Sequence, residues 1–483
     1  MPDTADTPAA RPRPARPPSS SRAFGVLWGG QLVSLLGSSA AAFCLALTVY
    51  TETGDASALA LIVGASTLGS IYLAPVAGAV SDHFTRRQVV CVGNVTLSLL
   101  SLLLAWQVWR FTDEGDAEYW TILLLVFLAG VVKAALSTTL AATVRQLRAE
   151  RDLSRVNGFT SLIETIPTVS GPVIGAALHT VVTPAAVFAF EAVTFAAAGA
   201  MAAAVRWPSV GRESGRNRRL RPFAGALRGF RFILGHSGFR RLQAAYAGVN
   251  LFAGLATAVV TVYVVSSSTA GTEERNLAAF TVAGPVGLLL GAIAMLTLGD
   301  RGSRFAAVVT AIAAGALLGR LGLALTAVPL LWFLAQLLNQ ACVQISNAHA
   351  TAVWQERTPT DIQATVFGAR RLLGQGLFPP AVVLGGFLAD RGFQDHGRLA
   401  EAAGTLVPRL AEDGGGAGLL LACCALGQAA LALLLACSAR VRRLTARPRP
   451  APQSPASPTA ASEPCHASDP AVPSRRPTTG PAS

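Results

Sequence analysis

Long apolar runs recur along the whole chain and are separated by short polar or charged segments. A helix that crosses the hydrocarbon core of a bilayer needs about 20 mostly apolar residues. Twelve runs meet that requirement, at residues 24–50, 57–80, 88–109, 119–142, 157–181, 185–205, 242–265, 277–299, 305–326, 328–353, 364–389 and 418–438. The pattern therefore predicts an all-α polytopic membrane protein with twelve transmembrane helices.

The composition supports this prediction. Of the 483 residues, 52% are hydrophobic and 13% are charged, whereas about a quarter of the residues of a soluble protein are charged. The first run exceeds the apolar core of about 7–15 residues in a signal peptide, so we expect it to remain as the first span. Lys133 is the single lysine of the sequence, which excludes a P-loop lysine and an ATPase built on one.

The charged segments alternate between basic and acidic from loop to loop. Arginines gather around residues 86–87, 145–155, 206–241 and 440–449, and acidic residues gather around residues 52–55, 113–118 and 273–274. Because cytoplasmic loops retain Lys and Arg, we expect both termini in the cytoplasm and the chain in the inner or plasma membrane of the cell. The net charge of +13 is then a topology signal, and we expect no nucleic-acid partner.

The long basic segment at residues 206–241 divides the twelve runs into two sets of six. We expect an N-terminal six-helix bundle at residues 23–205, a cytoplasmic linker at 206–241 and a C-terminal six-helix bundle at 242–439. Residues 1–22 and 440–483 are rich in Pro, Ser, Thr and Ala. Such a composition does not bury enough apolar surface to fold, so we expect two disordered cytoplasmic tails.

The second part of the linker has its own pattern. Between residues 223 and 234, apolar residues alternate with Arg228 and Arg231. This pattern is typical of an interfacial helix that lies against anionic lipid headgroups. A solvated charge run is the alternative interpretation.

A motif stands between the second and third runs. It reads Gly78-Ala-Val-Ser-Asp82-His83-Phe-Thr-Arg86-Arg87. Gly78 permits close packing at a helix end, and Asp82 offers a carboxylate to a facing helix terminus or arginine. We expect Arg86 and Arg87 to hold the cytoplasmic face.

This segment resembles the cytoplasmic loop motif of the major facilitator superfamily, which has arginine where this chain has His83. The resemblance implies two six-helix bundles and transport of a small molecule by alternating access. It also implies a charge latch between the bundles that favours the outward-facing state. Asp82 would form that latch with Arg370 and Arg371, at the start of the eleventh run.

Further segments are similar to one branch of that superfamily, which includes enterobactin-type siderophore exporters and macrolide efflux pumps. They are Phe188–Phe195 in the sixth run, Trp354–Pro359, Val366–Arg371 and Gly386–Arg391. Gly171-Pro172 in the fifth run resembles a signature of drug antiporters, and Pro379-Pro380 lies in the eleventh. Proline removes a backbone donor and glycine lets helices approach, so we expect bends or close crossings at which the bundles hinge.

Four ionisable residues lie inside the predicted spans, where charge is costly and often functional. They are Lys133, Glu164, Glu191 and Arg320. Lys133 and Glu164 lie at depths of roughly 15 and 10 Å in consecutive helices, at 1.5 Å per residue. We hypothesise an ion pair between them that responds to proton or substrate; a permanent structural ion pair is the alternative. Glu191 is a coupling candidate or a capping and pairing residue near the outer interface.

Amide side chains mark a candidate substrate cavity, namely Gln31, Asn250, Gln336, Asn339, Gln340, Gln344 and Asn347. Gln336, Gln340 and Gln344 are four residues apart and form a stripe on one helix face, which favours a wet interior over lipid. Interhelical hydrogen bonds are the alternative. No metal-ligand spacing or nucleophile triad is recognisable, so we expect neither an enzyme nor a cofactor.

These patterns and the resemblance predict a secondary transporter that exports a small amphipathic molecule, such as a drug, an antibiotic or a siderophore, by proton antiport. The expected partners are the substrate, protons and membrane lipids, and we expect a monomer. An importer of a small solute is one alternative. A transporter-like sensor or scaffold that moves no solute is the other.

Overall fold

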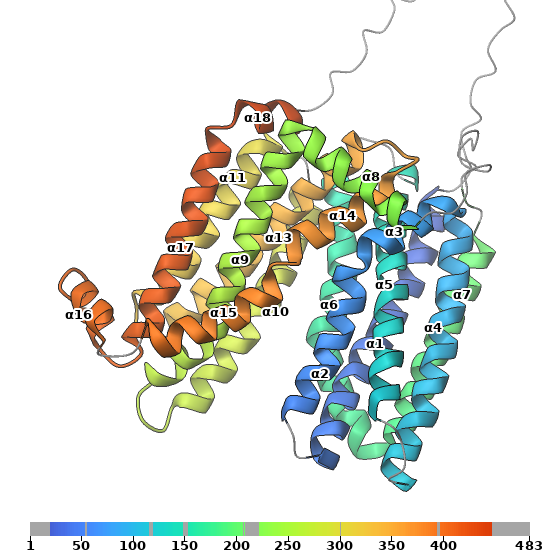
Figure 1. The fold of residues 1–483 in the computed structure, drawn as a ribbon, viewed down its shortest axis with the longest axis horizontal. Helices are drawn as coiled ribbons and strands as arrows, with labels where there is room; N and C mark the ends of the chain where they lie inside the picture. The colour runs from blue at the N-terminus through green and yellow to red at the C-terminus, as the bar shows by residue number, and fades with distance from the viewer. Residues whose placement is uncertain are drawn as a thin grey trace, which may run out of the picture. The chain divides into compact units, whose positions relative to one another are not determined.

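The computed structural model describes residues 20–53, 56–114, 119–147, 153–205, 207, 222–299, 301–393 and 397–446. Within these ranges the chain is helical and contains no strand (Figure 1). Helix α1 begins at Ser20 and helix α18 occupies Ala439–Thr445, so both reach into segments that we expected to be tails. Residues 1–19 and 447–483, the rest of those tails, lie outside the described residues, as do 206 and 208–221 of the linker.

The N-terminal half contains six spans. Its elements are α1 (Ser20–Thr53), α2 (Ala56–Thr67), a π-helical turn η1 (Leu68–Tyr72), α3 (Ala74–His83), α4 (Arg86–Trp109), a second π-helical turn η2 (Arg110–Glu114), α5 (Tyr119–Leu147), α6 (Leu153–Val181) and α7 (Pro184–Ala204). The linker contributes α8 (Pro222–Gly235).

The C-terminal half repeats this plan. Its elements are α9 (Ser237–Ser266), α10 (Glu273–Leu298), α11 (Arg304–Ala314), a π-helical segment η4 (Gly315–Leu321), α12 (Gly322–Ala324), α13 (Pro329–Arg357), α14 (Gln363–Gln375), α15 (Phe378–Arg391), α16 (Arg398–Gly404), a 3₁₀ turn η5 (Pro408–Ala411) and α17 (Gly415–Ala436). Both halves belong to one compact unit, Met1–Ala446.

The number of spans agrees with the predicted twelve. Ten helices among the described residues are long and apolar enough to cross a membrane, and α2 with α3 forms an eleventh span that is bent by 48°. Helix α13 has the length, 29 residues, but its Gln and Asn side chains lower its mean hydropathy. With α13 as the twelfth span, the chain is an all-α membrane protein of two six-helix bundles.

Local sequence explains where several of these helices begin. The Thr85 side chain accepts from the backbone N–H of Gln88, and the Gln88 side chain accepts from the backbone N–H of Thr85, which forms a capping box at the start of α4. Thr183 caps α7, and Pro184 is its first residue. Proline is favourable there because the N–H group that it lacks would have no partner in the first turn of a helix. Short polar turns thus separate long apolar helices.

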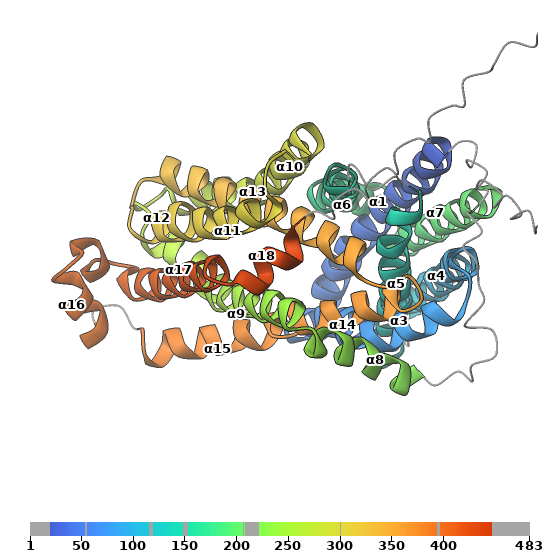
Figure 2. The ribbon, with the colours of Figure 1, turned by 90° about the horizontal axis from the view of Figure 1, so that it is seen from above.

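Each half has its own apolar core. Leu97, Phe195 and their neighbours form one core in the N-terminal half, and Tyr263, Trp332 and Leu421 lie in a core of the C-terminal half. Between the halves, α3 packs against α14 and α6 packs against α10, and Figure 2 shows α6 beside α10. These contacts lie at the end of the bundle that carries the 83–85 turn, here called the motif end.

Candidate functional site

The loop motif lies at a close crossing of two helices from different halves. A Cβ atom at Gly78 of α3 would clash with the carbonyl of Ala364 on α14, and a Cβ atom at Gly368 of α14 would clash with the carbonyl of Ala74 on α3. Each helix therefore presents a glycine to the backbone of the other. The close packing predicted for Gly78 is present, and Gly368 is its counterpart.

The same crossing places the Asp82 carboxylate at the N-terminus of α14. Its Oδ1 accepts from the backbone N–H of Ala364 at 3.1 Å, and its Oδ2 accepts from the backbone N–H of Thr365 at 2.7 Å. The first N–H groups of a helix have no partner within the helix and carry the positive end of its dipole. Asp82 thus caps a helix of the other half.

The two motif arginines hold the surrounding helices. Arg86 donates from Nη2 to Oε1 of Gln363 at 3.2 Å, across the halves, and Arg87 donates to the carbonyl of Ala203 at the end of α7 at 2.8 Å. The motif therefore ties α3 and α4 to both α7 and α14.

The contact between the halves differs from the latch that the resemblance implied. Asp82 binds backbone N–H groups of α14, and neither Arg370 nor Arg371 pairs with it among the described contacts. Arg370 remains within its own half, where it donates to Oγ1 of Thr351 at 3.1 Å and lies 5.6 Å from the Trp354 ring. The physical reason is that α14 turns its N-terminus, and not its second and third turns, toward Asp82.

Arg371 crosses the boundary between the halves at another place. Its Nη1 donates to Oγ of Ser137 on α5 at 2.8 Å, and it is the cation whose charge acts on Glu164 of α6. Arg371 from the C-terminal half therefore contacts α5 of the N-terminal half, and its charge acts on Glu164 of α6.

Glu191 is the centre of a buried polar cluster in the N-terminal half. Its side chain is 4% exposed. Oε1 accepts from Oγ of Ser38 on α1 at 2.7 Å, and Oε2 accepts from Oγ of Ser101 on α4 at 3.0 Å. Nζ of Lys133 on α5 lies 3.6 Å from Oε1. Four helices thus converge on one carboxylate, as a buried charge requires.

The predicted Lys133–Glu164 pair is therefore wrong. Lys133 pairs with Glu191, and the cation whose charge acts on Glu164 is Arg371 and not Lys133. Depth alone suggested the first pairing, but α6 packs mainly against α1 and α10 rather than α5. Glu191 thus forms an ion pair, and its role in coupling stays a prediction.

The two charged pairs are connected through one face of α5. Lys133 and Ser137 are one helical turn apart, so they lie on the same face. Lys133 reaches Glu191, and Ser137 accepts from Arg371, whose charge acts on Glu164. The Lys133 side chain is 41% exposed, so this polar track, defined as Glu191, Lys133, Ser137, Arg371 and Glu164, remains accessible to water or ligand.

Arg320 is separate from that track. It lies in the π-helical segment η4, which packs against α17. One buried guanidinium nitrogen, Nη1, has no hydrogen-bond partner. Because π-helical segments often occur at functional sites, Arg320 remains a candidate, but it does not couple directly to the other three charges.

The amide stripe of α13 packs against a helix, α10. Gly284, Gly287 and Gly291 of α10 lie against it, and a Cβ atom at these glycines would contact Gln336, Gln340 and Gln344. Small residues on α10 leave the room that these long amides occupy. The stripe is thus part of the packing between α10 and α13, and contact of its half-buried members Gln336 and Gln340 with a substrate stays a prediction.

The remaining amides are divided between packing and exposure. Asn339 is buried and lies against Gly315 and Gly319 of η4. Asn250 donates to the carbonyl of Tyr246, one turn earlier in α9. Gln31 is half-buried and Asn347 is exposed. Asn347 is therefore the member of the predicted set that is best placed to meet a solute.

The predicted hinge residues behave in two ways. Gly171 lies so close to Ser39 of α1 that an added Cβ would clash, and Pro172 is accommodated inside the continuous helix α6. This is a close crossing without a break. In contrast, Pro379 and Pro380 open α15 directly after a break at residues 376–377.

Three further hydrogen bonds between the halves were not predicted from the sequence. The Tyr72 hydroxyl donates to the carbonyl of Gly376 at 2.8 Å, and so joins the break in the second span to the break in the eleventh. Asn157 donates to Gln355 at 2.9 Å, and Gln355 donates to the carbonyl of Ala141 at 2.9 Å. Their only sequence signal is a polar residue within a span.

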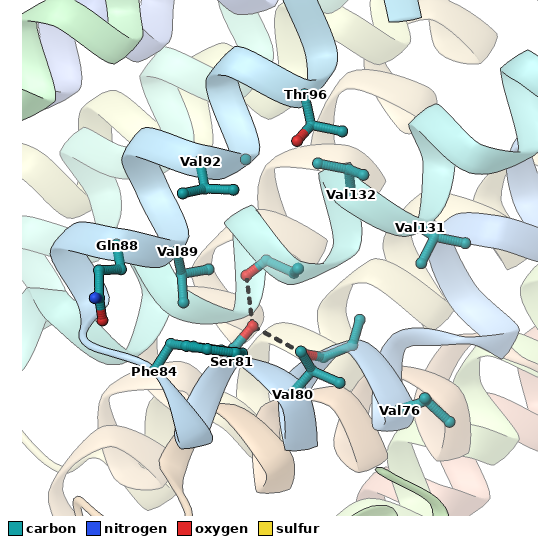
Figure 3. Close-up of a pocket in the computed structure, with 13 residues that line it drawn as sticks. Val76, Val80, Ser81, Phe84, Gln88, Val89, Val92, Thr96, Val131 and Val132 are labelled. Carbon is teal, nitrogen blue, oxygen red and sulfur yellow. Dashed lines mark hydrogen bonds between the residues drawn. The ribbon is translucent and has the colours of Figure 1, made fainter. Parts of the chain in front are cut away.

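An apolar cavity of about 460 Å³ lies beside the loop motif, between α3, α4 and α5. Figure 3 shows Ser81 at its edge, with hydrogen bonds to the carbonyls of Ala77 and Ala135. Valines dominate the lining and no charged residue contributes to it. Val92, one of the lining residues, is 63% exposed, so the cavity is at the surface of the N-terminal half and suits an apolar group.

In the described part of the chain, no group of three His, Cys, Asp or Glu residues is arranged to hold a metal ion. The polar track is therefore the concentration of chemistry that the structure offers inside the membrane-spanning region. It contains two carboxylates, two cations and three serine hydroxyls when Ser38 and Ser101 are included.

Comparison with known proteins decides the family. The family model of the Major Facilitator Superfamily matches residues 27–380, most of the chain. The chain belongs to the major facilitator superfamily. It is accordingly a multi-pass membrane transporter, and both family and fold point away from an enzyme.

Individual relatives are distant. Over 191 residues the chain is 24% identical to macrolide efflux protein A of Streptococcus pyogenes, a match that covers 39% of this chain and 45% of that protein. The chain thus spans less than half the length of that curated relative.

Solved structures share the fold over nearly their whole length. A bacterial homologue of the iron transporter ferroportin, in an outward-facing state, has a TM-score of 0.63 at 15% identity and covers 86% of this chain and 98% of its own. The E. coli fucose:proton symporter has a TM-score of 0.58 at 15% identity and covers 86% and 99%. At these identities the likeness shows the fold alone.

Proposed function

We propose that this chain exports a small amphipathic molecule, such as a drug, an antibiotic or a siderophore, by proton antiport with alternating access. The proposal includes a monomer in the plasma or inner membrane with both termini in the cytoplasm, because the arginine-rich loops cluster at the motif end. The name of the Streptococcus pyogenes relative, a macrolide efflux protein, supports export and an antibiotic as the exported molecule.

The observation that carries the proposal is the position of Arg371, which donates to Ser137 of the other half and whose positive charge acts on Glu164 of α6. In alternating access the motif end opens when the halves separate there. Separation removes Arg371 from Glu164 and leaves a carboxylate without its cation. Because a nearby positive charge favours the ionised form of a carboxyl group, a Glu164 that has lost Arg371 takes up a proton more readily.

The direction of coupling follows from this linkage. Protonation of Glu164 removes its attraction to Arg371 and so favours the arrangement in which the motif end is open to the cytoplasm. A substrate that binds better when the motif end is closed drives the return. Protons moving inward thereby drive substrate outward.

Lys133 and Glu191 supply the second part of the mechanism. Their pair lies one helical turn from Ser137, which holds Arg371. Because Lys133 is 41% exposed and Glu191 is enclosed by two serine hydroxyls, the ammonium is the mobile partner. We assign it to contact with the polar end of the substrate, with Asn347 as an accessible amide on the C-terminal half.

A drug-susceptibility panel tests the proposal. Cells that express the chain and matched cells that lack it are compared against macrolides and other amphipathic compounds, with and without a protonophore. Expression should raise the inhibitory concentration of at least one class, and the protonophore should abolish the difference. Increased accumulation of a solute would instead favour an importer, and no difference for any compound would favour a sensor or scaffold.

A matched pair of variants links the phenotype to the mechanism. Glu164→Gln removes the carboxylate that interacts with Arg371, while Glu274→Gln removes an exposed carboxylate at the start of α10. Resistance should fall at least tenfold in the first variant and remain in the second. Equal resistance in both variants would contradict the role of Glu164.

A further inference from the structure

Helix α8 of the linker lies against both halves at the motif end. Gly225 is packed against Ala79 of α3, and a Cβ at Gly225 would lie 2.9 Å from the Cβ of Ala79. Gly229, one turn later, is packed against Thr365 and Ala369 of α14. Figure 1 shows α8 beside α14 and α3. The helix thus covers the crossing at which Gly78 and Gly368 meet.

The opposite face of α8 is not covered by any other described part of the chain. Phe223, Leu227 and Leu234 are 77%, 47% and 49% exposed, and Arg231 lies exposed among them. Neither Arg228 nor Arg231 forms an ion pair with another described residue. Apolar side chains with interspersed arginines are typical of a helix that lies in the interface of an anionic leaflet.

The two contacts of α8 differ in how they respond to separation of the halves. Only His236 separates α8 from α9 of the C-terminal half, and α8 also packs on α14 of that half. When the halves part, α8 therefore stays with α14 and loses α3. The Gly225–Ala79 contact is the one that breaks.

Arg228 lies at that breakable contact. Its Nη2 is 3.9 Å from the point where a Cβ of Gly225 would be, beside Ala79 of α3. An anionic headgroup held by Arg228 and Arg231 is therefore positioned to touch α3 and α8 together while the motif end is closed. Once α8 has left α3, the same headgroup contacts one half only.

We propose that α8 is a lipid-binding clasp, and that anionic phospholipid bound at Arg228 and Arg231 stabilises the arrangement in which the motif end is closed. The ligand is the phosphate-bearing headgroup of an anionic lipid, and Phe223, Leu227 and Leu234 enter the acyl region beside it. A ligand that binds one of two states better shifts the equilibrium toward that state. The inference rests on the proposed alternating access, but it involves neither substrate nor proton.

The test measures a distance across the motif end in vesicles. Spin labels are placed at exposed positions on opposite halves, Ala204 at the end of α7 and Leu298 at the end of α10, in a full-length chain whose native cysteines are replaced. The labelled chain is reconstituted in phosphatidylcholine alone or with about one third phosphatidylglycerol. Each arginine near an anionic membrane surface increases the affinity for that surface roughly fivefold. We therefore expect phosphatidylglycerol to raise the ratio of the short-distance to the long-distance population at least threefold.

Two double variants separate the clasp from a general effect of charge. Arg228→Gln with Arg231→Gln should remove the response to phosphatidylglycerol. Arg440→Gln with Arg443→Gln, on exposed positions of α18, removes the same charge at the same end and should keep the response. If the first double variant does not fold, Arg231→Gln alone, at an exposed site, should reduce the response by about half.

The proposal is contradicted if the wild-type chain gives the same label-distance populations in vesicles with and without phosphatidylglycerol. It is also overturned if the α8 variant responds like wild type, or if the α18 variant loses the response equally. Because no substrate is added, a chain that transports nothing in the drug panel can still show the clasp. A chain that transports normally can equally lack it, so the two proposals fail independently.

Discussion

The carboxylate of Asp82 accepts a hydrogen bond of 2.7 Å from the backbone N–H of Thr365, across the boundary between the two halves. A second bond, from the N–H of Ala364, makes the contact bidentate. The partners are backbone groups at a helix N-terminus, which offer donors in a fixed direction. The contact can therefore form only when α3 and α14 cross closely, so it reports directly on closure of the motif end.

Asp82→Asn should weaken that closure. The amide retains one acceptor oxygen and presents an N–H₂ group to the second N–H donor, so one charged hydrogen bond is lost. Such a bond contributes about 1.5–3 kcal/mol, which corresponds to a shift of roughly ten- to a hundredfold in the equilibrium. The distance between spin labels at Ala204 and Leu298 measures this shift in the equilibrium. Asp361→Asn, which changes an exposed carboxylate beside α14, is the control and should leave the distance unchanged.

Gly368→Val should prevent the motif end from closing. An added side chain at this position clashes with the carbonyl of Ala74, and the backbone of α3 cannot give way without moving the whole helix. We expect the short-distance population to disappear and transport to fall at least tenfold. Gly386→Ala on α15, where nothing lies within 4 Å of the added Cβ, is the control. A wild-type distance distribution in Gly368→Val would contradict the close crossing.

Ser38→Ala should destabilise the N-terminal half. It removes one of two hydroxyl donors from the buried carboxylate of Glu191, at a cost of about 1.5–3 kcal/mol for a hydrogen bond to a charged group. Thermal unfolding in detergent should show a lower midpoint. Thr281→Ala, which removes an exposed hydroxyl bonded only to the carbonyl of Leu277 in its own helix, should not. Equal midpoints for the two variants would mean that Glu191 does not depend on Ser38.

Much of the fold follows from the sequence because the bilayer imposes a length on each apolar run. Even the weakest span, α13, was placed, although its amides make it too polar to qualify by hydropathy. The breaks are harder to predict. Tyr72 lies at the break in the second span and binds Gly376 at the break in the eleventh. No local sequence pattern indicates that a hydroxyl of one half binds a carbonyl of the other.

The site was predicted less well than the fold, for a physical reason. Sequence gives the depth of Lys133 and Glu164 but not the direction in which each side chain leaves its helix. Lys133 turns toward Glu191, where Ser38 and Ser101 already provide donors. Two ordinary serines on α1 and α4 carry no signal of that role. Asp82 was more predictable, since the motif itself suggested a facing helix terminus.

The amides of α13 illustrate the same limit. A stripe of Gln336, Gln340 and Gln344 fits a wet cavity or a helix contact equally well until the facing surface is known. Glycines at 284, 287 and 291 of α10 supply that surface. Their spacing of three and four residues is visible in the sequence, but the pairing of α10 with α13 is not.

The central claim is that protonation of Glu164 couples the proton gradient to export. The most direct test is uptake of a compound identified by the drug panel into inside-out vesicles with an acidic interior, for wild type, Glu164→Gln and Glu274→Gln. Wild type and Glu274→Gln should accumulate the compound as long as the gradient lasts. Glu164→Gln should lose gradient-driven accumulation at least tenfold while it still binds the compound. Accumulation by Glu164→Gln with the same dependence on the gradient as wild type would contradict the account.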